Sequence, residues 1–449
     1  MRSRRPIAKC PPGEFEVIVE GLTHDGRGIG RIAEKPVFIP GALPEERVRF
    51  AYTSVRRDFA EGELREVLRA SPLRVTPRCP HYGICGGCSF QHVRDEAQIT
   101  LKSELLDEQL RRMGGLVPEE RLAPLTDSAW GYRLKARLGV KFVAKKARVL
   151  VGFRERATPY IADISHCPVL DPRVGLELET LAEAIGRLSI RDRVPQIEVA
   201  MGDDRVSLVF RLLADLTEDD EAILGALGQR LSAEILIQRE GPDSVRPING
   251  APEHRLHYAL ADQGIVMAFR ATDFTQVNMG INRKLIARVL DLLAPEPGDR
   301  VLDLFCGIGN FTLPLARRAG WVVGVEGSAV AIDRARDNAR ANGLTQVAFH
   351  VADLTQPPST APWAEGRYDR LLLDPSRAGA VEILPEVSRW QPSRIVYVSC
   401  NPSTLARDAG VLVHELGYRL LKTGVMDMFP QTAHVESIAV FERARGRCG

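Results

Sequence analysis

The stretch RVLDLFCGIGNF, residues 300–311, decides the fold. Its first residues form an apolar run typical of a buried strand, and this run passes into a turn that carries Gly307 and Gly309. Because glycine lacks a Cβ, such a turn lets a ligand approach the backbone amides at the start of the next helix. Many nucleotide-binding proteins share one glycine-rich turn, so this motif alone does not identify the ligand.

Further apolar runs follow at 321–326, 347–353, 368–374 and 394–399, and amphipathic helix patterns separate them. Buried strands that alternate with helices predict a doubly wound α/β sheet of the Rossmann-like class. We expect this domain to span residues 273–449. Ligands of such sheets bind outside the carboxyl ends of the strands, where the motifs of this chain fall.

Acidic residues end the second and third strands of this sheet. Glu326 is placed to accept hydrogen bonds from ribose hydroxyls, and Asp353 is placed to accept one from an adenine amino group. Position 312 is Thr, where a dinucleotide motif requires a third small residue, so the turn favours S-adenosylmethionine over NAD. The alternative is that these acids only cap helices. Helix capping would explain each acid by itself, but it would not explain why the ends of three successive strands carry one.

The next two strands end in reactive groups. Asp374 ends the fourth strand, and Cys400 ends the fifth, where Pro402 stops the strand. A cysteine at a strand end is, by itself, more often a buried core residue. Beside Asp374, however, its thiolate suits addition to carbon 6 of uracil, which activates carbon 5 for methylation. Glu436, in the apolar last strand, is the candidate base for the carbon-5 proton, unless it faces solvent.

Three regions precede this domain. Residues 12–71 alternate as short strands and predict an oligonucleotide-binding (OB-like) β-barrel, although a barrel without a ligand fits the same pattern. Residues 72–92 show neither a helix nor a strand periodicity and contain Cys79, Cys85 and Cys88. The pattern of residues 93–272 predicts an α+β domain. Six arginines would charge the barrel, and Arg133, Lys135 and Arg137 would line one strand face as a phosphate-binding stripe or as a solvated face. The six arginines of the barrel are Arg27, Arg31, Arg47, Arg49, Arg56 and Arg57.

The composition fits an intracellular protein. No apolar run approaches the roughly 20 residues of a membrane-spanning helix, and Pro11 and Pro12 stand where a signal peptide needs an apolar stretch. We therefore expect a cytoplasmic protein that does not bind membranes. In such a reducing compartment, the eight cysteines are metal ligands or catalysts more often than disulfides.

Motifs along nearly the whole chain resemble the RNA uridine-5-methyltransferase family, of the type that carries a TRAM barrel and an iron–sulfur cluster (the RumA/RlmD type). They are GLTHDGRGIGR (21–31), VFIPGALPEE (37–46), FTQVN (274–278), DLFCGIGNF (303–311), LDPSRAG (373–379), VSCNPSTLARD (398–408) and HVESIAVF (434–441). The resemblance implies methylation of carbon 5 of one uridine of 23S rRNA, expected to be uridine 1939, by a monomer that uses S-adenosylmethionine.

The resemblance also implies a role for each matching residue. Cys400 is the nucleophile and Glu436 the base, while Phe274 and Asp374 contact the target base. The implied cofactor residues are Gln276, Phe305, Asn310, Glu326, Asp353 and Asp374. Ser376 stands where the family commonly has a second proline after the aspartate, which puts the rigidity of that turn in doubt.

The family places a [4Fe–4S] cluster on Cys79, Cys85, Cys88 and Cys167, and four thiolates can hold one. Structural zinc is the alternative, although the first gap is wider than a usual zinc knuckle. A tRNA uridine-5-methyltransferase would normally lack both the barrel and this cysteine set. A silent RNA-binding protein or rRNA chaperone would not need Cys400, Asp374 and Glu436, and a radical methylthiotransferase would carry its barrel at the other end.

Overall fold

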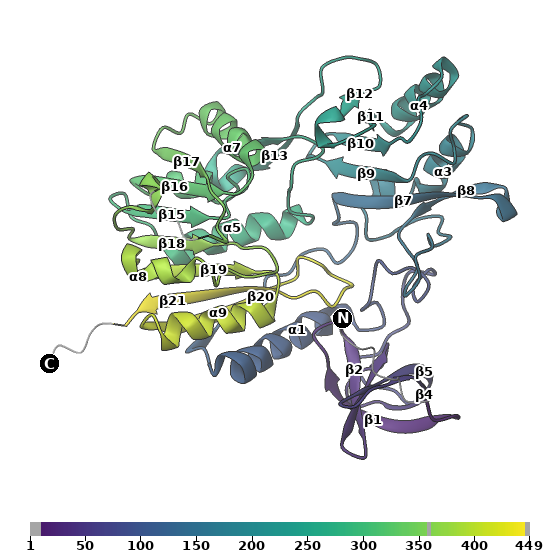
Figure 1. The fold of residues 1–449 in the computed structure, drawn as a ribbon, viewed down its shortest axis with the longest axis horizontal. Helices are drawn as coiled ribbons and strands as arrows, with labels where there is room; N and C mark the ends of the chain where they lie inside the picture. Colours follow the sequence, from purple (N-terminus) through teal and green to yellow (C-terminus); the bar gives the residue numbers. More distant parts are fainter. Residues whose placement is uncertain (1–9, 357–360, 445–449) are drawn as a thin grey trace, which may run out of the picture.

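The computed structural model describes residues 10–356 and 361–444, in which a small barrel, a mixed sheet and a large α/β sheet follow one another (Figure 1). The predicted methyltransferase domain extends to 449, so its last five residues lie outside the described part. Of the described helices, none is both long and apolar enough to cross a membrane.

The N-terminal strands close into a barrel in the order β1-β2-β3-β5-β4, which confirms the predicted OB-like barrel. Val19, Val37, Ile39 and Phe50 alternate with exposed or partly exposed residues along their strands and fill the interior of the barrel. Gly62 is required inside, because a Cβ there would lie 2.4 Å from the Phe50 ring. The strands are β1 (Phe15–Leu22), β2 (Arg27–Ile32), β3 (Lys35–Pro40), β4 (Arg47–Val55) and β5 (Ala60–Arg69).

A six-stranded sheet of order β12-β11-β10-β9-β7-β8 forms the middle of the chain, with α3 and α4 packed on it. Thr217 begins α4 with a capping box, in which its hydroxyl accepts from the Asp220 amide and Asp220 accepts from the Thr217 amide. The elements are β7 (Lys135–Val143), β8 (Arg148–Gly152), α2 (Pro172–Gly175), α3 (Leu178–Gly186), β9 (Gln196–Met201), β10 (Val206–Arg211), α4 (Glu218–Leu231), β11 (Ala233–Gln238) and β12 (Arg246–Pro247).

The C-terminal sheet has the order β17-β16-β15-β18-β19-β21-β20-β6, which confirms the doubly wound α/β prediction. Strands β17 to β19 run parallel, and β21 joins β19 antiparallel. Its strands are β6 (Glu120–Arg121), β15 (Arg300–Leu304), β16 (Trp321–Glu326), β17 (Val347–Val351), β18 (Arg370–Leu373), β19 (Arg394–Ser399), β20 (Tyr418–Met426) and β21 (Glu436–Arg443).

Two hydrophobic clusters cover the two faces of this sheet. Val301 packs on one face with α5, α6, α7 and the β13–β14 hairpin, while Leu302 packs on the other with α1, α8 and α9. The elements are α1 (Asp95–Gln109), β13 (Leu256–Leu260), β14 (Ile265–Phe269), α5 (Met279–Leu293), α6 (Thr312–Ala316), α7 (Ala329–Ala341), α8 (Val387–Trp390) and α9 (Pro402–His414). Short turns complete the chain as η1 (Leu110–Gly114), η2 (Ala144–Lys146), η3 (Pro242–Ser244), η4 (Ala261–Gln263), η5 (Pro362–Ala364) and η6 (Leu384–Glu386).

The helix α1, the short strand β6 and the β13–β14 hairpin all pack with the α/β sheet. These three elements lie within residues 93–272, so part of that range shares its core with the α/β sheet. Isolated local patterns could not show this, because only tertiary contacts decide which core a helix such as α1 joins. The predicted domain boundaries stay predictions.

Candidate active site

A cleft of about 1,100 Å³ lies at the carboxyl ends of β15, β16, β18 and β19, where a sheet of this kind binds its ligands. This volume exceeds that of most pockets for one small ligand. All but two of the predicted catalytic, cofactor and substrate residues line it. They are Phe274, Gln276, Phe305, Glu326, Asp374, Cys400 and Glu436.

Asn310 and Asp353 do not line this cleft. The Asn310 amide exchanges hydrogen bonds with the Asn282 amide and accepts one from the Tyr258 hydroxyl at 2.9 Å. Asp353 is exposed and accepts from the amide and hydroxyl of Thr355, and the hydroxyl bond holds the pKa of its carboxyl below the usual value. Both side chains are thus satisfied within the protein, and their role in cofactor binding stays a prediction.

The glycine-rich turn holds an unusual backbone at Phe305, whose φ is 66°. A bulky residue seldom adopts this left-handed conformation, and such strain gathers at ligand sites. The amides of Phe305 and Cys306 both donate to the Val325 carbonyl, at 2.8 and 3.1 Å. The turn therefore stays against β16, whose last residue Glu326 accepts from the Gly307 amide at 3.3 Å.

Asp303 lies beneath this turn and was not predicted as a site residue. It is fully buried, and one carboxyl oxygen accepts from the Thr312 hydroxyl at 2.6 Å. Its other oxygen has no hydrogen-bond partner among the described residues. Burial, with the charges of Asp374 and Glu326 nearby, raises the pKa of Asp303 to about 8.

Cys400 and Glu436 meet across the antiparallel pair of β19 and β21. Ser399 pairs with Ser437 in this antiparallel register. Cys400, which follows Ser399, therefore lies opposite Glu436, which precedes Ser437. Burial first, and then the carboxylates of Glu436 and Asp374, raise the pKa of the Cys400 thiol to about 11. The thiol is therefore protonated at neutral pH until a base takes its proton.

The two carboxyls near Cys400 also resist ionisation. Burial raises the pKa of Asp374 to about 7. Burial and the charge of Asp374 raise the pKa of Glu436 to about 8, against the opposing effects of Arg377 and Lys102. Both carboxyls thus titrate near neutral pH, which suits proton transfer.

Arg377 and His434 also line the cleft, and the Arg377 guanidinium lies 2.7 Å from His434 Nδ1. Burial, with Arg377 next, lowers the pKa of His434. The imidazole is therefore predominantly neutral at pH 7 and accepts from the guanidinium. Arg377 and His434 both lie in motifs already singled out, LDPSRAG and HVESIAVF, but neither was predicted as a site residue.

The segment that carries Phe274 is tied to the central sheet by Lys135. The ammonium of Lys135 donates to the carbonyls of Ala271 and Asp273, and Asp273 forms a buried ion pair with Arg334 at 3.0 Å. Phe274 itself is 77% exposed, which is unusual for a phenylalanine. The protein thus holds an apolar ring at the mouth of the cleft.

Arg133, Lys135 and Arg137, which could form a phosphate-binding stripe or a solvated face, differ in their surroundings. Lys135 is committed to carbonyls, Arg133 lines the cysteine cavity, and Arg137 lies 3.7 Å from Glu198. In the barrel, five of the six predicted arginines pair with acids rather than standing free. These five are Arg27, Arg31, Arg47, Arg49 and Arg57. Most of the acids lie on other strands of the barrel, so charge counting along the chain does not reveal these pairs.

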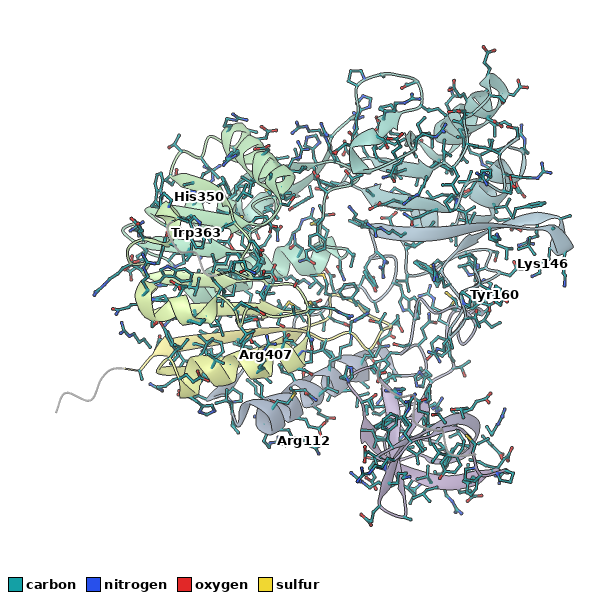
Figure 2. All side chains as sticks on the ribbon, viewed as in Figure 1. Arg112, Lys146, Tyr160, His350, Trp363 and Arg407 are labelled. Atoms are coloured by element: carbon teal, nitrogen blue, oxygen red, sulfur yellow. The ribbon has the colours of Figure 1, made fainter. Side chains whose placement is uncertain are left out.

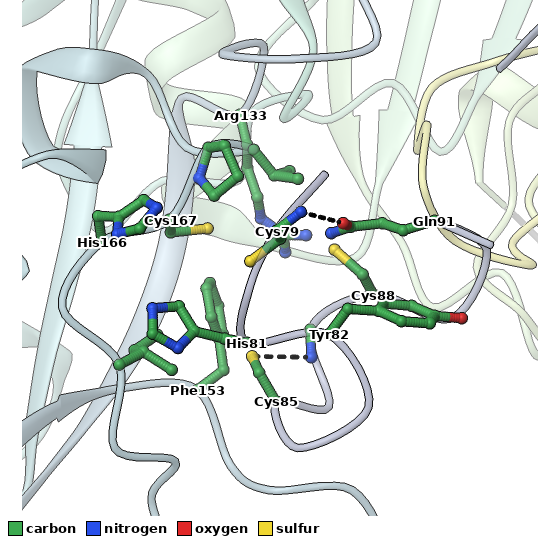
Figure 3. Close-up of a pocket in the computed structure, with 14 residues that line it drawn as sticks. Cys79, His81, Tyr82, Cys85, Cys88, Gln91, Arg133, Phe153, His166 and Cys167 are labelled. Carbon is green, nitrogen blue, oxygen red and sulfur yellow. Dashed lines mark hydrogen bonds between the residues drawn. The ribbon is translucent and has the colours of Figure 1, made fainter. Parts of the chain in front are cut away.

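The cysteines predicted as cluster ligands line one cavity, although Cys167 is far from the others in sequence (Figure 3). The sulfurs of Cys79, Cys85, Cys88 and Cys167 surround a common space in the view of Figure 3, and Arg133 lies beside it. Burial raises the pKa of the Cys85, Cys88 and Cys167 thiols, that of Cys88 to about 12. A bound metal centre would favour the thiolate forms of these cysteines.

Within residues 10–356 and 361–444, no group of three or more His, Cys, Asp or Glu side chains is close enough to hold one metal ion. A zinc ion needs all its sulfur ligands at about 2.3 Å. The four thiols share one cavity without the close arrangement of a formed single-metal site.

Two family models match the chain. A methyltransferase domain matches residues 295–412, and a TRAM domain matches residues 13–64. A solved structure of the tRNA (uracil-54, C5)-methyltransferase of Pyrococcus abyssi, in complex with S-adenosyl-L-homocysteine, superposes with a TM-score of 0.72. It covers 95% of this chain and 100% of its own, at 24% identity, and therefore shows a shared fold.

Curated relatives match over the full length. The 23S rRNA (uracil(1939)-C(5))-methyltransferase RlmD of Methylococcus capsulatus is 54% identical over 98% of this chain and 99% of its own. The protein of the same name from Alkalilimnicola ehrlichii is also 54% identical, with the same shares covered, and that of Alcanivorax borkumensis is 51% identical over 99% of both chains. The chain therefore belongs to the family of 23S rRNA (uracil-C5)-methyltransferases.

Proposed function

We propose that this protein transfers the methyl group of S-adenosylmethionine to carbon 5 of a uracil in 23S rRNA. One observation carries the proposal: a cysteine and a carboxyl stand opposite each other in the cleft that also contains the glycine turn and Glu326. The full-length relatives are named for position 1939, and we extend that position to this chain.

The reaction begins when the sulfur of Cys400 forms a bond to carbon 6 of uracil. The thiol proton passes to Asp374, whose raised pKa makes its carboxylate a competent acceptor near neutral pH. The electron pair of the carbon 5–carbon 6 double bond moves toward the carbonyl oxygen at carbon 4. Arg377 lines the cleft, and its positive charge stabilises the enolate that results.

Carbon 5 of this enolate then attacks the methyl carbon of S-adenosylmethionine. A carbon–carbon bond forms, the sulfur–methyl bond breaks, and S-adenosylhomocysteine leaves. Glu436 next removes the proton on carbon 5, the double bond re-forms, and the bond between Cys400 and carbon 6 breaks. Glu436 must be ionised for this step, and its pKa of about 8 makes it a stronger base than an ordinary carboxylate.

The two ligands occupy different parts of the cleft in this proposal. S-adenosylmethionine lies along the glycine turn, with Glu326 on its ribose and Phe305 and Gln276 beside it. The target uracil lies between Cys400 and the exposed ring of Phe274, on which it stacks. A base inside a duplex cannot reach this position, so the target is flipped out or single-stranded.

The RNA partner is further supported by the TRAM match of the barrel. Phosphate contacts are expected from basic side chains that form no ion pair with an acid among residues 10–356 and 361–444, such as Lys141 and Arg154. Both line one hollow together with Lys146 and Tyr160. Figure 2 shows Lys146 and Tyr160 far from the α/β sheet. The monomeric state and the cytoplasmic location stay predictions.

We also propose that Cys79, Cys85, Cys88 and Cys167 hold a [4Fe–4S] cluster. The cavity that all four cysteines share supports the proposal, since four thiolates can hold such a cluster, and Arg133 would offset their negative charge. When bound, the cluster cross-links residues 79–88 to residue 167 and supplies no electron to methyl transfer. The chain's own residues perform every step of the reaction above.

The proposal is tested by incubating purified protein with labelled S-adenosylmethionine and 23S rRNA transcribed without modifications. We expect one 5-methyluridine, at the position that corresponds to 1939. A tRNA transcript serves as the control substrate and should remain unmethylated. Methylation of tRNA instead of 23S rRNA, or no methylation of either, would overturn the proposal.

A further inference from the structure

The loop Asp427–Val435, which joins β20 to β21, is held almost entirely by residues from the first third of the chain. The buried ammonium of Lys102 donates to Asp427 at 2.7 Å and to the Phe429 carbonyl at 3.1 Å. The Tyr132 hydroxyl donates to the Pro430 carbonyl at 2.9 Å. The conformation of this loop therefore depends on α1 and its neighbours.

Gln431 makes most of these connections. Its backbone amide donates to Gln98 Oε1 at 2.8 Å, its Nε2 donates to Asp95 at 2.8 Å, and its Oε1 accepts from Gln98 Nε2 at 3.0 Å. Its carbonyl accepts from the amides of Ser89 and Phe90, which directly follow Cys88. Gln431 is fully buried, and its φ is 67°. A non-glycine residue keeps this conformation only where its surroundings fix it.

The other side of the same loop faces the cleft. Phe429 and His434 line the cleft, with ring centroids 5.3 Å apart, and Glu436 follows directly after the loop. Met426 and Glu436 are paired residues of β20 and β21, so the loop closes this pair. A change in the path of the loop therefore moves the residue proposed as the base. Cys400 precedes α9 and Phe305 lies in the glycine turn, so neither depends on this loop.

We propose that Gln431 is a positioning residue for the proton-abstraction step, which it serves by holding the loop that places Glu436. The inference rests on the proposed function. Addition of Cys400 to carbon 6 and methyl transfer to carbon 5 do not use Glu436. Loss of the Gln431 bonds therefore slows most strongly the later step, in which the carbon 5–hydrogen bond breaks and Cys400 leaves. The methylated RNA then stays covalently bound to the enzyme.

The test uses Gln431→Gly in the full-length protein. Glycine keeps the backbone bonds and tolerates the positive φ, while the side-chain bonds to Asp95 and Gln98 are lost. The matched control is Thr217→Ala, which removes the cap of α4 in the central sheet and costs about 1 kcal/mol of stability. Unmodified 23S rRNA fragment and methyl-labelled S-adenosylmethionine are mixed with each protein, and labelled protein–RNA adduct is measured on denaturing gels.

We expect Gln431→Gly to accumulate at least about tenfold more adduct than the unchanged protein, with a burst of methyl transfer and slow release of product. Thr217→Ala should accumulate none above the unchanged protein. Gln98→Met, which keeps the side-chain volume of Gln98, decides by the same criteria if Gln431→Gly fails to fold. Equal slowing of methyl transfer and product release without adduct, unchanged kinetics, or adduct in Thr217→Ala would overturn the inference.

RNA that contains 5-fluorouridine separates this inference from the proposed function. The unchanged protein should form a stable adduct with that RNA, because fluorine replaces the proton that Glu436 removes. If it forms none, the proposed function fails. If it does so while Gln431→Gly releases ordinary product at the normal rate, only the role of Gln431 is wrong.

Discussion

Cys400 stands opposite Glu436 because the register of β19 and β21 pairs Ser399 with Ser437. On the other side of β19, β18 runs parallel and is followed directly by Asp374. Three neighbouring strands therefore deliver a thiol and two carboxyls of raised pKa to one cleft. This arrangement explains how a cysteine at a strand end becomes a nucleophile with a base beside it.

Replacement of the nucleophile should abolish the chemistry but not cofactor binding. In Cys400→Ala, no bond to carbon 6 can form, so we expect methyl transfer to fall by more than about 10³-fold. S-adenosylmethionine affinity, measured by equilibrium dialysis, should stay within about twofold, because the glycine turn and Glu326 are unchanged. Substantial residual transfer would contradict the role of Cys400.

Replacement of the base should trap the intermediate and also change the thiol. In Glu436→Gln, turnover should fall by about 10²–10⁴-fold, and methylated adduct should accumulate on ordinary RNA. The Glu436 carboxylate raises the pKa of Cys400, so its removal should lower that pKa. Alkylation of Cys400 by iodoacetamide, followed against pH, should therefore move to lower pH than in the unchanged protein, and a move to higher pH would count against this charge effect.

The pH dependence follows from the raised pKa of Glu436. Below about pH 8 its carboxyl is mainly protonated and cannot accept the carbon-5 proton, and above that pH it is ionised. Release of product from preformed methylated adduct should thus rise with pH and level off above about 8. Quenched single-turnover measurements give this rate, and a rate that falls as pH rises through this range would refute the assignment.

The exposed ring of Phe274 should contribute to RNA affinity and little to stability. Stacking on a base contributes about 1–3 kcal/mol, so Phe274→Ala should weaken binding of the substrate fragment by about 5- to 150-fold. The melting temperature should hardly change, because the ring is 77% exposed. Trp321 gives the control, because it begins β16 at the amino-terminal end of that strand, whereas the cleft lies at the carboxyl end. Trp321→Ala should leave RNA affinity within about twofold.

Metal analysis distinguishes the cluster from zinc. Protein purified without oxygen should contain about four irons and four sulfides per chain, with visible absorbance that Cys88→Ser abolishes. Zinc in place of iron would show that the cysteine cavity contracts around one ion. Cys306→Ser is the matched control, because Cys306 lies in the glycine turn and away from the cysteine cavity, and its iron content should be unchanged.

Strand patterns and motifs predicted the barrel, the α/β sheet and most of the cleft, because β15 to β19 are buried runs whose ends must meet at one edge. They did not predict that Cys400 faces Glu436, since register depends on pairing between distant strands. They did not predict that the Lys135 ammonium donates hydrogen bonds to the carbonyls of Ala271 and Asp273. Gln431 had no local signal, because its importance lies in bonds to residues more than three hundred positions away.

The central claim is that Cys400 forms a covalent bond to carbon 6 of uracil. Its most direct test is mass spectrometry of peptides from the complex of this protein with 5-fluorouridine RNA and S-adenosylmethionine. We predict one modified peptide, in which Cys400 carries a methylated fluorouridine nucleotide. Modification of another residue, or 5-methyluridine formation on ordinary RNA without any adduct on fluorinated RNA, would contradict the account.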